Sequence, residues 1–190
     1  MKRRLTQAIG GALVFAMFGG AWGAFGLYAL GRRDFVLAIP IAITIILTLG
    51  LTKLQRKIDA LPDERLTLMA AERDARGRRF FTIVNIAQAI AIFLAVQVWF
   101  NLHKPEYLAS TVAVIVGLHF IALAGPMEQP SHRIPGALLI ALGLGTLAVV
   151  PSQTLWPAVV GLGSALILWG CYARRLREVL SALRPPDTAI

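Results

Sequence analysis

The stretch FFTIVNIAQAIAIFLAVQVWF at residues 80–100 contains no charged side chain, and it decides the fold. A helix needs roughly 20 apolar residues to cross the ~30 Å hydrocarbon layer of a bilayer. Residues 80–100 meet that length. We therefore predict that this stretch spans a membrane as an α-helix.

Five further apolar segments fill most of the remaining chain. Together they predict six transmembrane helices, at about 5–30, 35–52, 80–100, 107–124, 134–150 and 156–173. Of the 190 residues, 57% are hydrophobic and only 15% are charged, which is too apolar a composition for one water-soluble core. The connections within successive pairs are short, so each pair should form an antiparallel hairpin. The prediction is a single all-α integral membrane domain over residues 1–190.

The positive charges predict the orientation of these helices. Three of the nineteen Lys and Arg residues, Arg32, Arg33 and Lys104, fall on one side, and the other sixteen fall on the opposite side. Since cytoplasmic loops carry the excess of Lys and Arg, both termini and the linker 53–79 should be cytoplasmic. The basic start at 1–4 also resembles a signal peptide, but the first apolar segment is too long for one and should be retained.

The aromatic residues agree with this orientation, because Trp and Tyr gather at membrane interfaces. Trp169 and Tyr172 are expected at the inner interface. Four others are expected at the outer interface: Tyr28, Trp99, Tyr107 and Trp156. The net charge of +9 then reflects contact with anionic lipid headgroups, and no nucleic-acid partner is predicted.

The linker 53–79 is the largest soluble element, and its pattern predicts a short amphipathic helix. Acidic residues follow Pro62, basic residues come later, and Gly77 is the expected stop. One interpretation is an interfacial helix that contacts lipid headgroups or a cytosolic partner. The other is a solvated elbow between two hairpins. The candidate contact residues are Arg56, Lys57, Arg73, Arg76, Arg78 and Arg79.

Ladders of small residues predict close contacts between helices. Packing within the chain is the favoured interpretation, and a homo-oligomer seam is the alternative. Pro40 should kink the second helix. The ladders are Ala12, Ala16, Gly20 and Ala24 with Gly19 and Gly23 in the first segment, Ala137, Ala141 and Gly145 in the fifth, and Gly161 and Ala165 in the sixth.

Polar residues inside the apolar segments are few, and three of them fall at similar depth. Asn85 and Gln88 lie three residues apart on the third segment, and His119 lies on the fourth. If these side chains meet, amide and imidazole groups can satisfy one another away from lipid. They form the candidate intramembrane polar site, either as a structural link between helices or as part of a small cavity that contacts a ligand.

Other chemistry has weaker support. Glu128 and His132 are four residues apart, but Pro126 and Pro130 favour a solvated loop there. The single Cys171 cannot form an internal disulfide. No second imidazole is expected at the depth of His119, so no metal and no cofactor are predicted. No catalytic set of residues is found, and an enzyme is the least supported class.

The segment Gly117-Leu118-His119-Phe120, followed by Leu123-Ala124, resembles an uncharacterised group of small bacterial membrane proteins in which G-L-H-F ends one helix. The resemblance covers the fourth segment and loosely the start of the fifth. It implies a multi-pass protein of the bacterial inner membrane and no particular activity.

Two functions of different class follow from these patterns. The first is a small helical bundle that binds or passes a small neutral or apolar molecule, with His119, Asn85 and Gln88 at its inner polar site and Pro40 near an outer constriction. The alternative is a membrane interaction or assembly protein that acts through the linker 53–79 and its helix seams. Membrane lipid is the expected partner of either.

Overall fold

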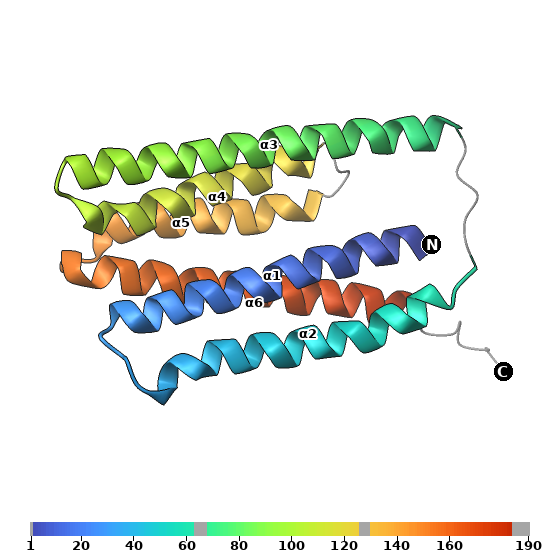
Figure 1. Ribbon diagram of the computed structural model, residues 1–190, viewed down its shortest axis with the longest axis horizontal. Coiled ribbons are helices and arrows are strands. Elements are labelled where there is room, and N and C mark those ends of the chain that lie inside the picture. Colours follow the sequence, from blue (N-terminus) through green and yellow to red (C-terminus); the bar gives the residue numbers. More distant parts are fainter. Residues whose placement is uncertain (1, 63–67, 126–129, 184–190) are drawn as a thin grey trace.

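The computed structural model describes residues 2–62, 68–125 and 130–183, and these ranges hold six α-helices and no strand (Figure 1). Short 3₁₀ turns precede α2, α4, α5 and α6. The helices run side by side along one axis. They are α1 (Lys2–Ala29), α2 (Ala38–Asp59), α3 (Leu68–Asn101), α4 (Leu108–Ala124), α5 (Arg133–Val149) and α6 (Trp156–Ala182).

The predicted set of six helices is confirmed, and five of them are long and apolar enough to cross a membrane. The exception is α5, which is apolar but only 17 residues long. At 1.5 Å per residue, α5 is about 25 Å long, whereas the 34 residues of α3 extend about 51 Å. The bundle therefore combines long helices with one short hairpin, α4–α5.

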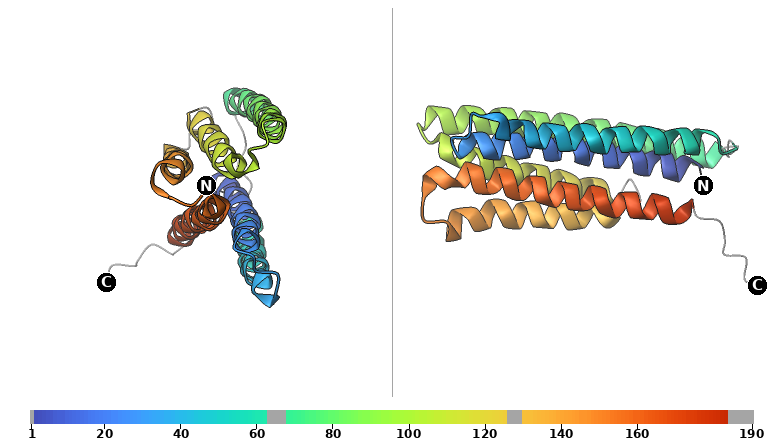
Figure 2. Two further views of the ribbon diagram at one scale, coloured as in Figure 1. Left: turned by 90° about the vertical axis from the view of Figure 1, so that its left-hand side faces the viewer. Right: turned by 90° about the horizontal axis from the view of Figure 1, so that it is seen from below.

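The central helix of the bundle is α1, which packs on α6 and on α2. On the other side of the bundle, α4 packs on α5, α3 and α6. Figure 2 shows the result: α2 lies outside α1, and α3 lies outside α4. Because α2 and α3 each have few protein neighbours, most of their apolar side chains are exposed and suited to contact with lipid.

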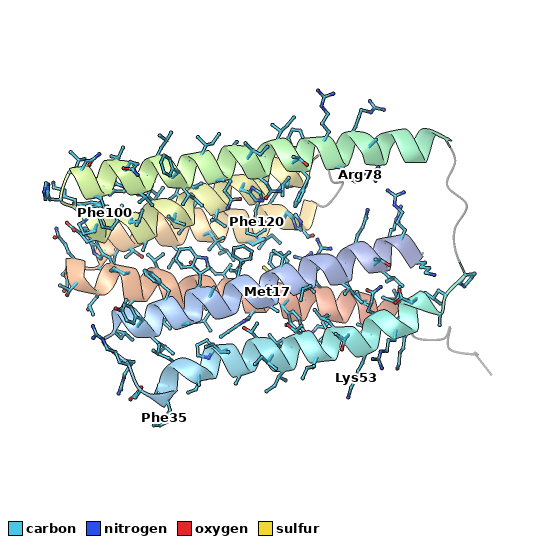
Figure 3. The ribbon with its side chains drawn as sticks, viewed as in Figure 1. Met17, Phe35, Lys53, Arg78, Phe100 and Phe120 are labelled. Atoms are coloured by element: carbon cyan, nitrogen blue, oxygen red, sulfur yellow. The ribbon has the colours of Figure 1, made fainter. Side chains whose placement is uncertain are left out.

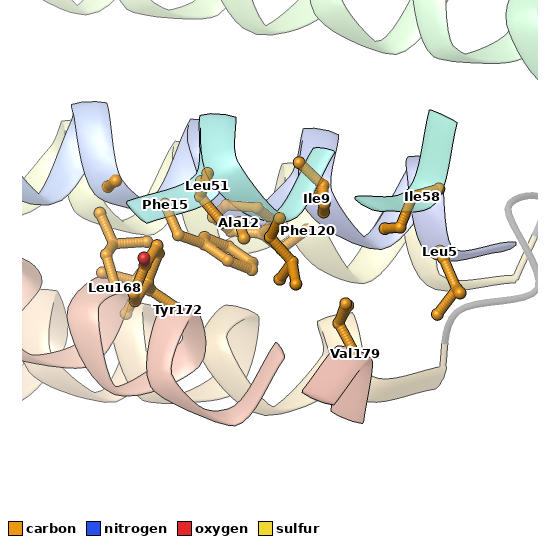
Figure 4. Close-up of a cluster of buried hydrophobic side chains, with 13 residues drawn as sticks. Leu5, Ile9, Ala12, Phe15, Leu51, Ile58, Phe120, Leu168, Tyr172 and Val179 are labelled. Carbon is orange, nitrogen blue, oxygen red and sulfur yellow. The ribbon is translucent and has the colours of Figure 1, made fainter. Parts of the chain in front are cut away.

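The main core lies along α1, where it meets α2, α4 and α6 (Figure 4). Leu5, Ile58 and Val179 form its end near the chain's N-terminus, and Phe15 and Leu168 lie further along it. Between these helices, Thr44 Oγ1 donates a hydrogen bond to the Ala16 carbonyl at 3.2 Å. Such contacts satisfy hydroxyl groups that lipid could not satisfy.

Glycines set the two closest helix crossings. A Cβ atom on Gly117 of α4 would lie 2.6 Å from the carbonyl oxygen of Gly136 on α5, and a Cβ on Gly136 would lie 2.7 Å from the carbonyl oxygen of Gly117. Similarly, a Cβ on Gly161 of α6 would lie 2.6 Å from the Cα of Gly26 on α1. Only glycine permits backbones to approach this closely.

The small-residue ladders divide into two kinds. Those of α1 and α6 pack together within the chain, where a Cβ on Gly23 would contact Ala165. The ladder predicted on α5 does not face α4, because Ala137 and Ala141 are exposed and Gly145 has open space around it. The α4–α5 contact uses Gly136 and the neighbouring face of α5 instead, about 100° around the helix from Ala137.

Basic residues mark one end of the bundle. Lys2 Nζ donates a hydrogen bond to the carbonyl oxygen of Asp59 at 2.9 Å, which brings the start of α1 to the end of α2. Figure 3 shows Lys53 and Arg78 toward this end, whereas Phe35 and Phe100 lie at the other. We call these the basic end and the opposite end.

The predicted separate helix in the linker is wrong in its described part. Residues 68–79 are the first turns of α3, which continues through Gly77 without a break. A glycine inside a helix is less favourable than alanine by about 1 kcal/mol. A long helix can tolerate this loss because each added residue forms a further backbone hydrogen bond. Residues 63–67 and the side chain of Arg73 lie outside the described residues. The other candidate contact residues are exposed at the basic end: Arg56, Lys57, Arg76, Arg78 and Arg79.

Three of the aromatic residues expected at the outer interface pack together at the opposite end. Trp99 stacks on Tyr107 with ring centroids 4.8 Å apart, and Tyr107 meets Trp156 edge-on at 5.1 Å. Tyr172, expected at the inner interface, is 4% exposed and donates a hydrogen bond to the Leu47 carbonyl at 3.0 Å. Trp169 packs over Gly19 in the α1–α6 contact. Both rings fill contacts between helices.

Pro40 lies in the first turn of α2 and is buried against Gly23 of α1. A proline in the first turn removes no helical hydrogen bond, because those N–H groups have no partner within the helix. Pro40 therefore begins the helix instead of interrupting it.

Candidate functional site

His119 on α4 contacts α3, the helix that carries Asn85 and Gln88, but no hydrogen bond joins the three side chains among the described residues. Asn85 Nδ2 donates to the carbonyl oxygen of Phe81 on its own helix at 2.9 Å. The imidazole of His119 hydrogen-bonds to the backbone of Val84 on α3, and its buried Nδ1 has no partner among the described residues. These contacts link α3 to α4. That the three side chains contact a ligand stays a prediction.

A second imidazole lies nearby, contrary to the expectation from the sequence. His132, in the turn between α4 and α5, is 7% exposed, although a solvated loop was expected there. Its ring meets Phe15 of α1 at 6.0 Å and Phe120 of α4 at 5.9 Å between centroids. Phe120 also meets the ring of His119 at 5.8 Å. Glu128, its expected partner, lies outside the described residues.

Arg175 of α6 reaches His132 from the other side. Arg175 Nη2 lies 3.4 Å from Nδ1 of His132, and its Nη1 lies 3.3 Å from the carboxylate of Glu178. The Arg174 Nε lies 3.1 Å from the same carboxylate. Two guanidinium groups therefore share one carboxylate, and His132 Nδ1 can accept from Arg175 only when it carries no proton.

These residues line a partly open cavity of about 310 Å³ between α5 and α6. Its basic-end mouth holds Ser131, His132, Arg174 and Arg175. The rest of the wall is formed mainly by apolar residues: Phe15, Ile134, Pro135, Leu138, Leu166, Ile167, Gly170 and Cys171. Leu166 lies eight positions before Arg174 on α6, so the apolar wall extends about 12 Å toward the middle of the bundle.

The cavity exists because α5 packs closely on α4 and less extensively on α6. Gly170 contributes to the space, since a Cβ atom there would meet nothing within 4 Å. The Cβ atom of a larger residue at this lining position would therefore strike no neighbouring atom. We call the lining residues, with their polar mouth, the α5–α6 site.

Burial, and after it the positive charges of Arg175 and His119, together lower the pKa of His132 to about 4. Because its ordinary pKa is 6.5, His132 is neutral near pH 7 in the folded protein. This protonation state leaves Nδ1 available as the acceptor for Arg175.

Acid is expected to destabilise the fold through His132. Between pH 6.5 and 4 the unfolded chain binds a proton that the folded chain does not, so the free energy of unfolding falls as the pH falls, by about 3 kcal/mol over this window. Thermal unfolding in detergent at pH 7.5, 6 and 5 measures the slope. The variant His132→Gln, which cannot titrate, should show a flatter pH dependence, and an unchanged slope would contradict the assignment.

Sequence reasoning missed the α5–α6 site because its polar members were interpreted separately. Arg174 and Arg175 counted only as charges that set orientation, and His132 as part of a loop. One signal was present: a histidine just before an apolar segment, and an Arg-Arg pair just after another, at the same predicted end of the bundle. The contact between them depends on how α5 and α6 pack, which the sequence pattern does not specify.

Among the described residues, no group of three His, Cys, Asp or Glu side chains is placed to hold a metal ion. Comparison of the chain with models of protein families, with curated proteins and with solved structures finds no match. The resemblance of Gly117–Phe120 to a bacterial group therefore stays a prediction, and the function must be argued from the site itself.

Proposed function

We propose that this chain is a multi-pass membrane protein that binds a small molecule with an apolar body in the α5–α6 site. The cavity carries the proposal, because it is concave, mostly apolar and polar at one end, as ligand sites usually are. The site predicted from the sequence lay at His119, one aromatic ring away. The polar groups at the cavity mouth come from α6 and from the turn before α5.

We further propose that the basic end faces the cytoplasm of a bacterium and that the membrane is the inner one. The distribution of Lys and Arg supports this orientation. The packed rings of Trp99, Tyr107 and Trp156 then lie at the outer interface, where such residues are favoured.

Binding has more support than passage through the bundle. The polar part of the cavity lining lies toward the basic end, whereas the described residues of the opposite end are joined by the aromatic cluster and by a hydrogen bond from Trp99 Nε1 to Thr111 Oγ1 at 2.9 Å. Pro40, the expected outer constriction, is buried against α1.

Filling the cavity should abolish binding. The probe is a neutral long-chain alcohol that carries a photoreactive diazirine, and it should label peptides 131–138 and 166–175 of the unmodified chain. We expect Gly170→Leu to reduce this labelling about tenfold, which is equivalent to a loss of ~1.4 kcal/mol of binding free energy. The leucine enters open space, so folding should be preserved. Photolabelling of the full chain in nanodiscs, followed by mass spectrometry, measures the change.

The matched control is Gly11→Leu, because Gly11 also has open space around its Cβ position but lies outside the cavity lining. It should label as the unmodified chain does. Equal labelling of all three proteins, or labelling spread evenly over the exposed faces of α2 and α3, would rule the proposal out.

The alternative of an assembly protein has one observation in its favour. The ladder Ala137, Ala141 and Gly145 on α5 faces away from the bundle. The ladders of α1 and α6 are occupied by contacts within the chain, so the outward face of α5 is the small-residue surface left for a second protein.

A further inference from the structure

We infer that the occupant of the α5–α6 site is an uncharged, single-chain lipophilic carbonyl compound, whose carbonyl oxygen accepts a hydrogen bond from Nε2 of His132. This inference rests on the proposed function and names the class of its ligand. Four observations carry it: the donor that His132 keeps, the pairing of the arginines beside it, the size of the cavity and the exposure of its apolar wall.

His132 supplies a hydrogen-bond donor at the polar part of the cavity lining. Arg175 Nη2 lies 3.4 Å from His132 Nδ1, and a guanidinium group can only donate, so Nδ1 must accept. A neutral imidazole carries one proton, which therefore belongs to Nε2. Among the described residues no acceptor meets Nε2, although the residue is only 7% exposed. A buried donor is costly to leave unsatisfied, so the site favours a ligand that brings an acceptor.

The arginines beside His132 already have partners, so the ligand need not supply an anion. Arg175 is held between His132 and the carboxylate of Glu178, which lies 3.3 Å from its Nη1. Arg174 shares this carboxylate at 3.1 Å, and its side chain is 51% exposed, so water reaches it. An anionic head would compete with Glu178 for the same guanidinium groups, and a cationic head would be repelled by both of them. An uncharged head meets neither cost.

A carbonyl group matches this lining better than a hydroxyl group does. A carbonyl oxygen only accepts, so the donor of His132 satisfies it. A hydroxyl head would bring a donor as well, and the only side-chain oxygen among the described lining residues is that of Ser131. A carbonyl head therefore leaves fewer polar groups to satisfy inside the cavity.

The size and surroundings of the cavity indicate a ligand with one apolar chain that arrives through the bilayer. A volume of about 310 Å³ is at the small end of ligand cavities, which usually measure roughly 300–1,000 Å³, and this favours one chain over two. Three residues of the apolar wall are also exposed on the outside of the bundle: Leu166 (69%), Ile134 (49%) and Leu138 (47%). A compound dissolved in the hydrocarbon layer can therefore reach the wall without crossing water.

Competition against the photoreactive alcohol tests the inference on the full chain in nanodiscs. The competitors are a long-chain methyl ketone, the alkane of equal length and the carboxylate of equal length, and each amount is expressed as a mole fraction in the bilayer. Labelling is measured on peptide 166–175, which contains no substitution made at position 132. We expect the ketone to halve labelling at about one tenth of the mole fraction that the alkane requires, a difference of ~1.4 kcal/mol.

Three variants assign this preference to a residue. His132→Leu removes the donor, so the ketone and the alkane should compete equally. His132→Gln keeps an N–H donor and should keep a clear preference for the ketone. The matched control is His119→Leu, which removes an imidazole one aromatic ring away and outside the described lining, and it should keep the tenfold preference.

Equal competition by ketone and alkane in the unmodified chain would overturn the inference, and this comparison does not depend on how any variant folds. A preference that persists in His132→Leu, or that His132→Gln or His119→Leu loses to the same extent, would overturn it as well. Competition by the carboxylate at a lower mole fraction than the ketone would do the same, because the ligand would then be anionic.

The two proposals fail in different ways. Labelling that is sensitive to Gly170→Leu but equally displaced by ketone and alkane supports the cavity and overturns the carbonyl ligand. Labelling that is indifferent to Gly170→Leu overturns the proposed function itself.

Discussion

Replacing Gly117 with leucine is expected to lower the free energy of unfolding by about 3 kcal/mol and to separate α4 from α5. The new Cβ atom would lie 2.6 Å from the carbonyl oxygen of Gly136 and 2.7 Å from Ile140 Cγ1. The first of these atoms belongs to the backbone of a helix, which cannot yield without moving α5 as a whole. Unfolding of the purified protein in mixed micelles of rising SDS content measures the loss.

Gly145→Leu is the matched control for this prediction. Gly145 lies on α5, and a Cβ there meets nothing within 4 Å, so the same chemical change should alter the free energy of unfolding little. If Gly117→Leu proved as stable as Gly145→Leu, the close crossing of α4 and α5 would be wrong. A loss in both variants would instead point to a second protein chain on the outward face of α5.

Phe15→Ala should have the other large effect, a loss of about 3–5 kcal/mol of unfolding free energy. Phe15 is 2% exposed and joins α1 to Phe120 and His132, so its removal leaves a void between three helices. The same void enlarges the α5–α6 site, which Phe15 lines. We expect a lower unfolding midpoint, and we expect the variant to bind photoreactive alcohols that are bulkier than those the unmodified chain binds.

Phe18 offers the comparison on the same helix. It is 53% exposed, so Phe18→Ala removes contacts mainly with lipid and should cost about 1 kcal/mol or less. Equal losses of unfolding free energy in the two variants would show that Phe15 contributes no more to the packing than an exposed phenylalanine does.

The helices could be predicted from the sequence because segment length and apolar composition determine them locally. Gly19, Gly23 and Gly161 were also recognisable as contact residues, since small side chains at helical spacing have one common use. Their partners were not predictable: the outward ladder on α5 looks the same in sequence as the inward ladder on α1, and only tertiary packing distinguishes them.

The site was only partly predictable for two physical reasons. A side-chain amide on a helix, such as that of Asn85, can donate to the carbonyl four residues earlier, so it does not need His119 as a partner. His132 belongs to the turn that joins the two shortest helices, and α1 continues 13 residues from Phe15 to Lys2, or about 20 Å. Longer neighbours therefore bury a turn that would be solvated in a bundle of equal helices.

The short α5 has a consequence for the bilayer itself. A helix of about 25 Å beside a hydrocarbon layer of ~30 Å leaves a mismatch of about 5 Å, which lipids relieve by thinning locally. Local thinning brings the headgroup regions closer together beside α5, so the protein would shape the bilayer that surrounds it. The same mismatch favours thin membranes over thick ones, and bilayer thickness becomes a physical factor that sorts this protein among membranes.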